Sequence, residues 1–141
     1  IDHAIERYSR RIKRFTKETM QHDSGTQDMI GHAEAIWHTA RSYLFSTIEE
    51  TWFTTVEQDI CPKNSKHQMR FATTYSIRQA KVATDMVYDL CSTDSIHHSE
   101  PIHRCFLDVH VISQHLQGRP EGYAVVGRYK LGLPVHSYLV D

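Results

Sequence analysis

Apolar side chains recur along most of the chain at steps of three and four residues, the spacing that places them on one stripe of an α-helix. The first stripe covers residues 1–15. The second begins after a polar loop at residues 22–26 and continues to about Asp59. At 1.5 Å per residue this second helix is roughly 50 Å long, which is typical of one rib of an antiparallel bundle. The pattern therefore predicts two amphipathic helices in this part of the chain.

The second half of the chain carries two further helical patterns. A break at residues 61–64 is followed by Ser65 and Gln68, which have the capping-box spacing that starts a helix. Residues 91–99 contain Ser, Thr and Asp with little periodicity, and we expect a loop there. The tripeptide Ser-Glu-Pro at residues 99–101 is typical of the cap and first turn of a fourth helix.

The fourth helix is expected to stop before Gly118 and Pro120. We expect residues 121–141 to form an irregular or partly extended tail. Four amphipathic helices with short connections predict an all-α fold, an up-down four-helix bundle that occupies residues 1–141 as one domain. Such a bundle hosts many unrelated functions, so the fold alone names none.

Charge and cysteine content narrow the classes of function. The formal net charge is −1, which argues against nucleic acid or a membrane surface as an obligatory partner. No apolar run approaches the roughly 20 residues that cross a bilayer, and the N-terminus has no signal-peptide layout, so we expect a cytoplasmic protein. Cys61, Cys91 and Cys105 are far apart and form no CxxC pair, so we interpret them as buried free thiols.

Eleven histidines make a metal site the first chemical hypothesis to weigh. Three groupings qualify by proximity in sequence: His32, Glu34 and His38; His97, His98 and His103; and His110 with His115. None has the ligands one turn apart that zinc and di-iron sites on helices use. We therefore expect no bound metal.

The first predicted helix is strongly basic toward its C-terminal end. Its cationic side chains are Arg7, Arg10, Arg11, Lys13, Arg14 and Lys17. A solvated helix face is the usual interpretation of such a run. The alternative is a phosphate clamp for a nucleotide, a flavin phosphate or coenzyme A.

The most informative stretch is the fourth predicted helix. Residues 99–115 open with Ser-x-Pro-Ile-x-Arg, continue through Phe-x-Asp and close with Gln-His. This pattern resembles the last long helix of the acyl-CoA dehydrogenase superfamily, and most of all that of its flavin-dependent monooxygenase branch. Arg70 and residues 80–90 resemble the preceding helix of that family, and residues 126–134 resemble its usual ending.

The resemblance implies that this chain is the C-terminal bundle of a larger flavoenzyme that uses FMN or FAD. The family's N-terminal helical domain and middle β-domain are missing from the sequence, so the chain alone would be inactive. In the monooxygenase branch a separate flavin reductase supplies reduced flavin, and oxygen is used to hydroxylate an aromatic or related substrate. The family also implies a homo-oligomer, a tetramer built largely from this domain.

The same resemblance points to particular residues. His115 falls near flavin and substrate, where its imidazole would form a hydrogen bond or move a proton at neutral pH. The alternative for His115 is a helix-end histidine that interacts with the last carbonyls. Arg14, Ser92 and Thr93 fall in segments that resemble flavin-contacting parts of the family.

The fourth predicted helix contains a possible ion pair, and two parts of the sequence differ from the family's pattern. Arg104 and Asp108 are one turn apart and are expected to form an ion pair that orients the fourth helix. Leu107 stands where the family has Arg, and the sequence Cys-Ser-Thr at residues 91–93 replaces a Gly-rich turn.

Two other functions stay open. An acyl-CoA dehydrogenase needs a catalytic carboxylate, whereas the fourth helix closes with Gln114 and His115. A non-catalytic helical oligomerisation module is the other alternative, favoured by the missing domains and the altered motifs.

Overall fold

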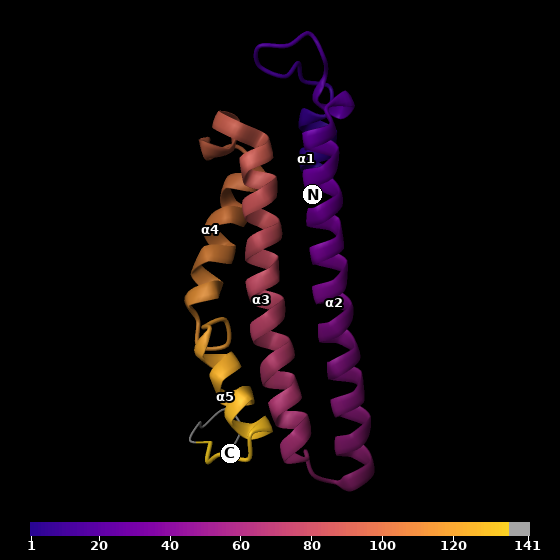
Figure 1. Ribbon diagram of the computed structural model, residues 1–141, viewed down its shortest axis with the longest axis vertical. Helices are drawn as coiled ribbons and strands as arrows, with labels where there is room; N and C mark the ends of the chain where they lie inside the picture. The colour runs from indigo at the N-terminus through magenta and orange to yellow at the C-terminus, as the bar shows by residue number, and fades with distance from the viewer. Residues whose placement is uncertain (136–141) are drawn as a thin grey trace. The chain divides into compact units, whose positions relative to one another are not determined.

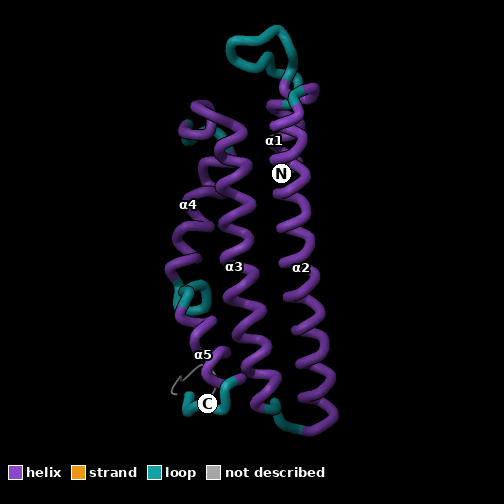
Figure 2. Tube along the Cα trace, viewed as in Figure 1, coloured by secondary structure: helices purple, strands orange, loops and turns teal. Residues whose placement is uncertain are grey.

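The computed structural model describes residues 1–135, and every regular element in that range is a helix (Figures 1 and 2). The α-helices are α1 (Asp2–Tyr8), α2 (Ser24–Gln58), α3 (Lys63–Cys91), α4 (Pro101–Gln114) and α5 (Glu121–Lys130). Two 3₁₀ turns, η1 (Met20–His22) and η2 (Ser92–Ile96), complete the set. The predicted all-α fold is confirmed, with α2 ending one residue before the predicted Asp59.

The first helix is shorter than its periodicity predicted. It ends at Tyr8, and residues 11–20 instead form a loop closed by a hydrogen bond from the Lys13 N–H to the Glu18 carbonyl over 2.9 Å. Phe15 has a φ of 66°, in the left-handed region that no residue of an α-helix adopts. The dense run of like charges in this segment makes a continued helix unfavourable, so the apolar spacing there was misleading.

The predicted irregular tail was also wrong for part of its length, because residues 121–130 form α5. Pro120 occupies the N-cap, Glu121 lies in the first turn, and Arg128 and Lys130 lie in the last turn. These charges suit the helix dipole at each end. The remainder of the predicted tail, residues 136–141, lies outside the described residues.

The chain divides into two compact units. Unit 1 contains Ile1–His38 and Gln79–Val111, and unit 2 contains Thr39–Arg78 and Ile112–Asp141. Helices α2 and α3 each contribute one segment to either unit, and Figure 1 shows them as antiparallel neighbours joined by a short turn.

The core of unit 1 is built from small and medium side chains. Its buried members are Ala4, Tyr8, Ala33, Ala83, Val87, Cys91 and Ile102. Alanines on α1, α2 and α3 let the helix backbones approach closely.

Unit 2 has an aromatic core. The ring centroid of Phe71 on α3 lies 6.0 Å from that of Tyr43 on α2 and 5.8 Å from that of Tyr123 on α5, each in an edge-to-face arrangement. His67, which is buried, stacks on Tyr129 with 3.7 Å between centroids. The fifth helix is therefore packed onto α3 through two ring pairs, whose α3 members are four residues apart on one helix face.

All three cysteines are free, but only Cys91 is buried. Cys61 is half-buried and Cys105 is exposed, so the predicted burial was wrong for these two. Among residues 1–135 no helix is both long enough and apolar enough to cross a membrane.

Candidate functional site

The residue predicted to be catalytic, His115, follows directly after α4 and has an exposed side chain. Its backbone N–H donates to the Ile112 carbonyl over 3.0 Å. Its own carbonyl accepts from the N–H groups of Gly118 at 2.8 Å and Arg119 at 3.1 Å. His115 therefore sits in a closed, hydrogen-bonded turn.

Gly118 makes this turn possible. A Cβ atom at this position would lie 2.6 Å from the carbonyl oxygen of Ile112 and 2.8 Å from the side chain of Ile77. Any larger residue would have to displace backbone atoms next to His115. Glycine is required here because the backbone at residue 118 passes close to Ile112 and Ile77.

Two side chains of α3 hold the same turn. Buried Arg70 donates from Nη2 to the carbonyl oxygen of Leu116 over 2.6 Å, and fully buried Thr74 donates from Oγ1 to that of Gln117 over 2.8 Å. A charged donor makes the first of these bonds one of the stronger kind. The backbone on the C-terminal side of His115 is thus fixed to α3 while the imidazole remains in solvent.

Sequence reasoning missed Thr74 and treated Arg70 only as part of a resemblance. The available signal was their spacing of four residues, which places the two side chains on one face of a helix. A buried arginine on an apolar face needs acceptors, and the carbonyls of a turn after a helix supply them.

The alternative role for His115, an interaction with the last carbonyls of α4, stays a prediction. The carbonyl oxygen of Gln114 accepts a hydrogen bond from Nε of Arg119 over 3.0 Å. The side chain of His115 is exposed. An exposed histidine on a rigid backbone is a suitable group for proton transfer near neutral pH.

The basic run of the N-terminal segment is partly neutralised within unit 1. Arg7 Nη2 lies 3.3 Å from Glu100 Oε1, and Arg11 Nη1 lies 2.9 Å from Asp94 Oδ2. These pairs tie the N-terminal segment to η2 and to the residue before α4. In this structure Arg7 and Arg11 are therefore engaged with carboxylates, and the phosphate clamp stays a prediction for the basic run.

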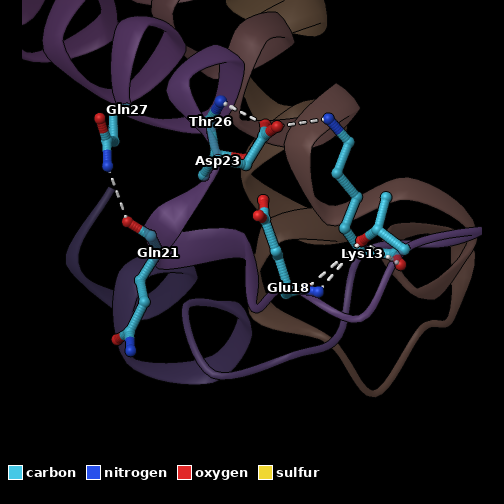
Figure 3. Close-up of polar contacts among 7 residues, drawn as sticks. Lys13, Glu18, Gln21, Asp23, Thr26 and Gln27 are labelled. Carbon is cyan, nitrogen blue, oxygen red and sulfur yellow. Dashed lines mark hydrogen bonds and ion pairs between the residues drawn. The ribbon is translucent and has the colours of Figure 1, made fainter.

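A third cation of the run, Lys13, is held by the residue that precedes α2 (Figure 3). Lys13 Nζ lies 2.5 Å from Asp23 Oδ1, while Asp23 Oδ2 accepts from the N–H of Thr26 at 2.9 Å and from its hydroxyl at 3.0 Å. The hydrogen bond from Lys13, followed by those from Thr26, lowers the pKa of Asp23. Asp23 therefore has two roles: it caps the N-terminus of α2 through Thr26, and it holds the preceding loop through Lys13.

Glu100 is a second carboxylate in unit 1 that contacts several side chains of the N-terminal segment. It contacts His3 Nε2 at 3.5 Å, Arg7 at 3.3 Å and the hydroxyl of Tyr8 at 3.3 Å. Burial pushes the pKa of Glu100 upward, but the hydrogen bond from His3, the charge of Arg7 and the Tyr8 hydroxyl outweigh it, so the pKa is lowered. Burial, followed by the proximity of the Cys91 thiol and the Glu100 carboxylate, raises the pKa of Tyr8 to about 12.

The three predicted cofactor-binding residues all belong to unit 1 and all are exposed. The guanidinium of Arg14 lies 4.9 Å from the ring centroid of Phe15 and has no recorded carboxylate partner within the described part of the chain. Ser92 and Thr93 begin η2. His115, the predicted catalytic residue, belongs to unit 2. The predicted catalytic residue and the predicted cofactor-binding residues therefore lie in different units.

Ser92 adopts a conformation that glycine ordinarily supplies. Its φ is 56°, and its carbonyl oxygen accepts a hydrogen bond from the Ser95 hydroxyl. A left-handed residue directly after a helix is a common way to end it. The Cys-Ser-Thr turn at residues 91–93 thus takes a glycine-like backbone without glycine.

The hydroxyls of Ser92 and Thr93 and the guanidinium of Arg14 are hydrogen-bond donors, and one of them is charged, which is the chemistry that a phosphate group accepts. All three residues are exposed and belong to unit 1.

Arg104 and Asp108 lie as the spacing predicted, with 3.6 Å between Nε and Oδ2. Their side chains are 86% and 71% exposed, so the pair contributes little to stability. Among residues 1–135 no group of three or more His, Cys, Asp or Glu side chains is placed to hold a metal. Glu34 and His38 form an ion pair of their own at 3.1 Å.

An open cavity of about 490 Å³ lies in unit 1. Ala83, Val87 and Ile102 give it an apolar wall, and Glu34 and His38 give it a polar one. None of the residues predicted to bind a cofactor lines it.

Comparison with known proteins agrees with this architecture. The family model described as acyl-CoA dehydrogenase, C-terminal domain, matches residues 1–120. Indole-3-acetate monooxygenase of Pseudomonas putida is 27% identical over 86 residues, which make up 61% of this chain and 22% of that enzyme. The matched chain thus spans less than a quarter of its curated relative. The chain belongs to the acyl-CoA dehydrogenase C-terminal domain family.

Proposed function

We propose that this chain is the C-terminal helical domain of a flavin-dependent monooxygenase that hydroxylates an aromatic or related substrate with reduced flavin and oxygen. The observation that carries the proposal is the turn after α4, where Arg70 and Thr74 fix the backbone and leave the imidazole of His115 exposed. The family match and the similarity to a monooxygenase support the same reading.

His115 is the residue to which we assign the chemistry of this domain. Its ring donates or accepts a hydrogen bond at the reacting oxygen and moves a proton, because an imidazole changes charge close to neutral pH. The flavin, when bound, supplies the electrons that activate oxygen. The fixed backbone keeps the ring in one position and so reduces the entropy lost on reaching the reactive geometry.

Arg14, Ser92 and Thr93 are assigned to the phosphate of FMN or FAD. Arg14 supplies charge, and the two hydroxyls supply directed hydrogen bonds. Arg7, Arg11 and Lys13 are paired with carboxylates. Of the remaining cations of the run we assign the contact to Arg14, which lies in the segment that resembles a flavin-contacting part of the family.

The remaining parts of the proposal concern the full-length protein. An N-terminal helical domain and a middle β-domain complete the flavin site, and a separate reductase delivers reduced flavin. The assembled protein is a cytoplasmic homo-oligomer, a tetramer. A non-catalytic oligomerisation module is the second candidate, favoured by the large exposed apolar side chains of α2.

The test is oxygen uptake by the full-length protein supplied with chemically reduced FMN or FAD and a panel of aromatic acids that includes indole-3-acetate. Substrate-dependent formation of a hydroxylated product supports the proposal. Reduction of a dye by acyl-CoA thioesters, without oxygen uptake, would replace it with dehydrogenase chemistry. The absence of both activities in a folded, flavin-saturated protein would favour the oligomerisation module.

A further inference from the structure

The open cavity of unit 1, about 490 Å³ in volume, has the size of a site for a small organic molecule. Four helices contribute to its lining: α1 through Asp2, α2 through Trp37, α3 through Ala80 and Ala83, and α4 through Cys105. Because the two α3 residues end at a methyl group, that helix leaves space where a larger side chain would fill it.

The charge on the cavity wall has one sign. Asp2 and Glu34 contribute two carboxylates, and His38 Nε2 lies 3.1 Å from Glu34 Oε2. Within the part of the chain that the structure describes, no Lys or Arg lines this cavity. A concave surface with carboxylates and no basic side chain attracts a cation and repels an anion.

The indole of Trp37 adds an aromatic surface to the same cavity. Trp37 lies three residues after Glu34 on α2, so the two side chains share one face of the helix, and Trp37 is 42% exposed. An indole beside a carboxylate suits an ammonium group, which the ring attracts through its quadrupole and the carboxylate through a charge-assisted hydrogen bond. The apolar residues of the wall, which suit an uncharged ring on the same ligand, are Ala83, Val87 and Ile102.

We propose that this cavity binds a small aromatic amine, with the ammonium group against Glu34 and Trp37 and the ring against the apolar wall. A carboxylic acid of the same shape would place its negative charge beside Glu34 and is rejected. The inference goes beyond the proposed function and does not depend on the flavin chemistry assigned to His115.

Cys105 supplies a local readout, because it lines the cavity and is exposed. The first test measures the alkylation rate of Cys105 in the full-length protein by peptide mass spectrometry, with phenethylamine or phenylacetate added. Phenethylamine at ten times its Kd is expected to slow this alkylation about tenfold by mass action. Phenylacetate, which has nearly the same shape and the opposite charge, is expected to leave the rate unchanged. Cys61, half-buried in unit 2, is the internal control and keeps its rate with either ligand.

The second test removes the charge of Glu34 and keeps the size of its side chain. Glu34→Gln is expected to raise the phenethylamine concentration that gives half-maximal protection of Cys105 about tenfold. Asp28→Asn is the matched control, because Asp28 also pairs with a histidine one turn later on α2, His32, but does not line the cavity. It is expected to protect as wild type does.

The third test fills the cavity without changing its charge. Ala80→Leu places a larger apolar side chain at a half-buried position of the wall, and protection by phenethylamine is expected to be lost with the helical circular dichroism retained. Equal protection by phenylacetate, protection by neither ligand, or unchanged protection in Glu34→Gln would overturn the proposal. Because alkylation is measured without turnover, a protein with no oxygenase activity still tests it.

Discussion

Buried Arg70 on α3 donates a hydrogen bond through Nη2 to the carbonyl oxygen of Leu116, 2.6 Å away, and so ties α3 to the residue that follows His115. Arg70→Met is expected to cost about 2 kcal/mol of unfolding free energy, because it removes a charge-assisted hydrogen bond and leaves a carbonyl without this donor. Urea unfolding measures the loss. Arg119→Ala, which removes an exposed side chain from the same turn, is the control and is expected to cost less than about 1 kcal/mol. Equal losses of unfolding free energy in the two variants would show that the buried hydrogen bond of Arg70 stabilises the protein no more than the exposed one of Arg119.

Two glycines give opposite expectations. Gly118→Ala is expected to destabilise the protein by about 2 kcal/mol, since the new methyl group would lie 2.6 Å from the Ile112 carbonyl. Gly127→Ala, inside α5 with open space around it, is expected to stabilise by up to about 1 kcal/mol. Thermal unfolding of the two variants checks both signs, and a stabilising Gly118→Ala would contradict the closed turn.

Glu100 makes the stability of the protein depend on pH. Its pKa in the folded state is lowered, so its stabilising contribution is fully present above the unfolded pKa, near 4.5, and is lost as the pH falls through the lower folded value. Glu100→Gln is therefore expected to unfold at a lower temperature than wild type at pH 7. The difference should shrink as the pH falls below 4.5. A constant difference across this acidic range would show that the contacts of Glu100 with His3, Arg7 and Tyr8 do not depend on its charge.

The cysteines are expected to react in a fixed order. Exposed Cys105 should be alkylated rapidly at pH 8, whereas burial raises the pKa of Cys91 to about 11 and keeps its thiol protonated and shielded. Mass spectrometry of the alkylated peptides after timed exposure measures the order. Cys105→Ser should remove the fast phase, and labelling of Cys91 in the folded protein at a similar rate would contradict its burial.

The long helices could be predicted from sequence because their apolar spacing is uninterrupted. The start of α2, the start of α4 and the stop before Gly118 were all marked by capping or breaking residues. The early end of α1 was missed because residues 9–19 contain neither Gly nor Pro. The chain turns there through backbone hydrogen bonds and a left-handed Phe15.

Helix α5 was missed for the opposite reason. Gly118 and Pro120 marked the end of the fourth helix, and an irregular tail was expected after them. Pro120 instead forms the N-cap of α5, and Gly122 is required where the backbone passes close to Thr74 and Arg70. Such contacts between distant segments have no local signature. The end of α4 beside His115 could be predicted from Gly118 and Pro120. The spacing of Arg70 and Thr74 places them on one face of α3, but it does not indicate that this face contacts the turn after α4.

The most direct measurement of the central claim compares wild type with His115→Asn in the full-length protein, following product formed per oxygen consumed with reduced flavin. Asparagine keeps a hydrogen-bonding side chain but cannot move a proton at neutral pH. We therefore expect the hydroxylation rate to fall about a hundredfold, with flavin binding unchanged and the pH profile flattened. His32→Asn, at an exposed position on α2, is expected to behave as wild type. A His115→Asn protein with wild-type rate and pH profile would contradict the assignment.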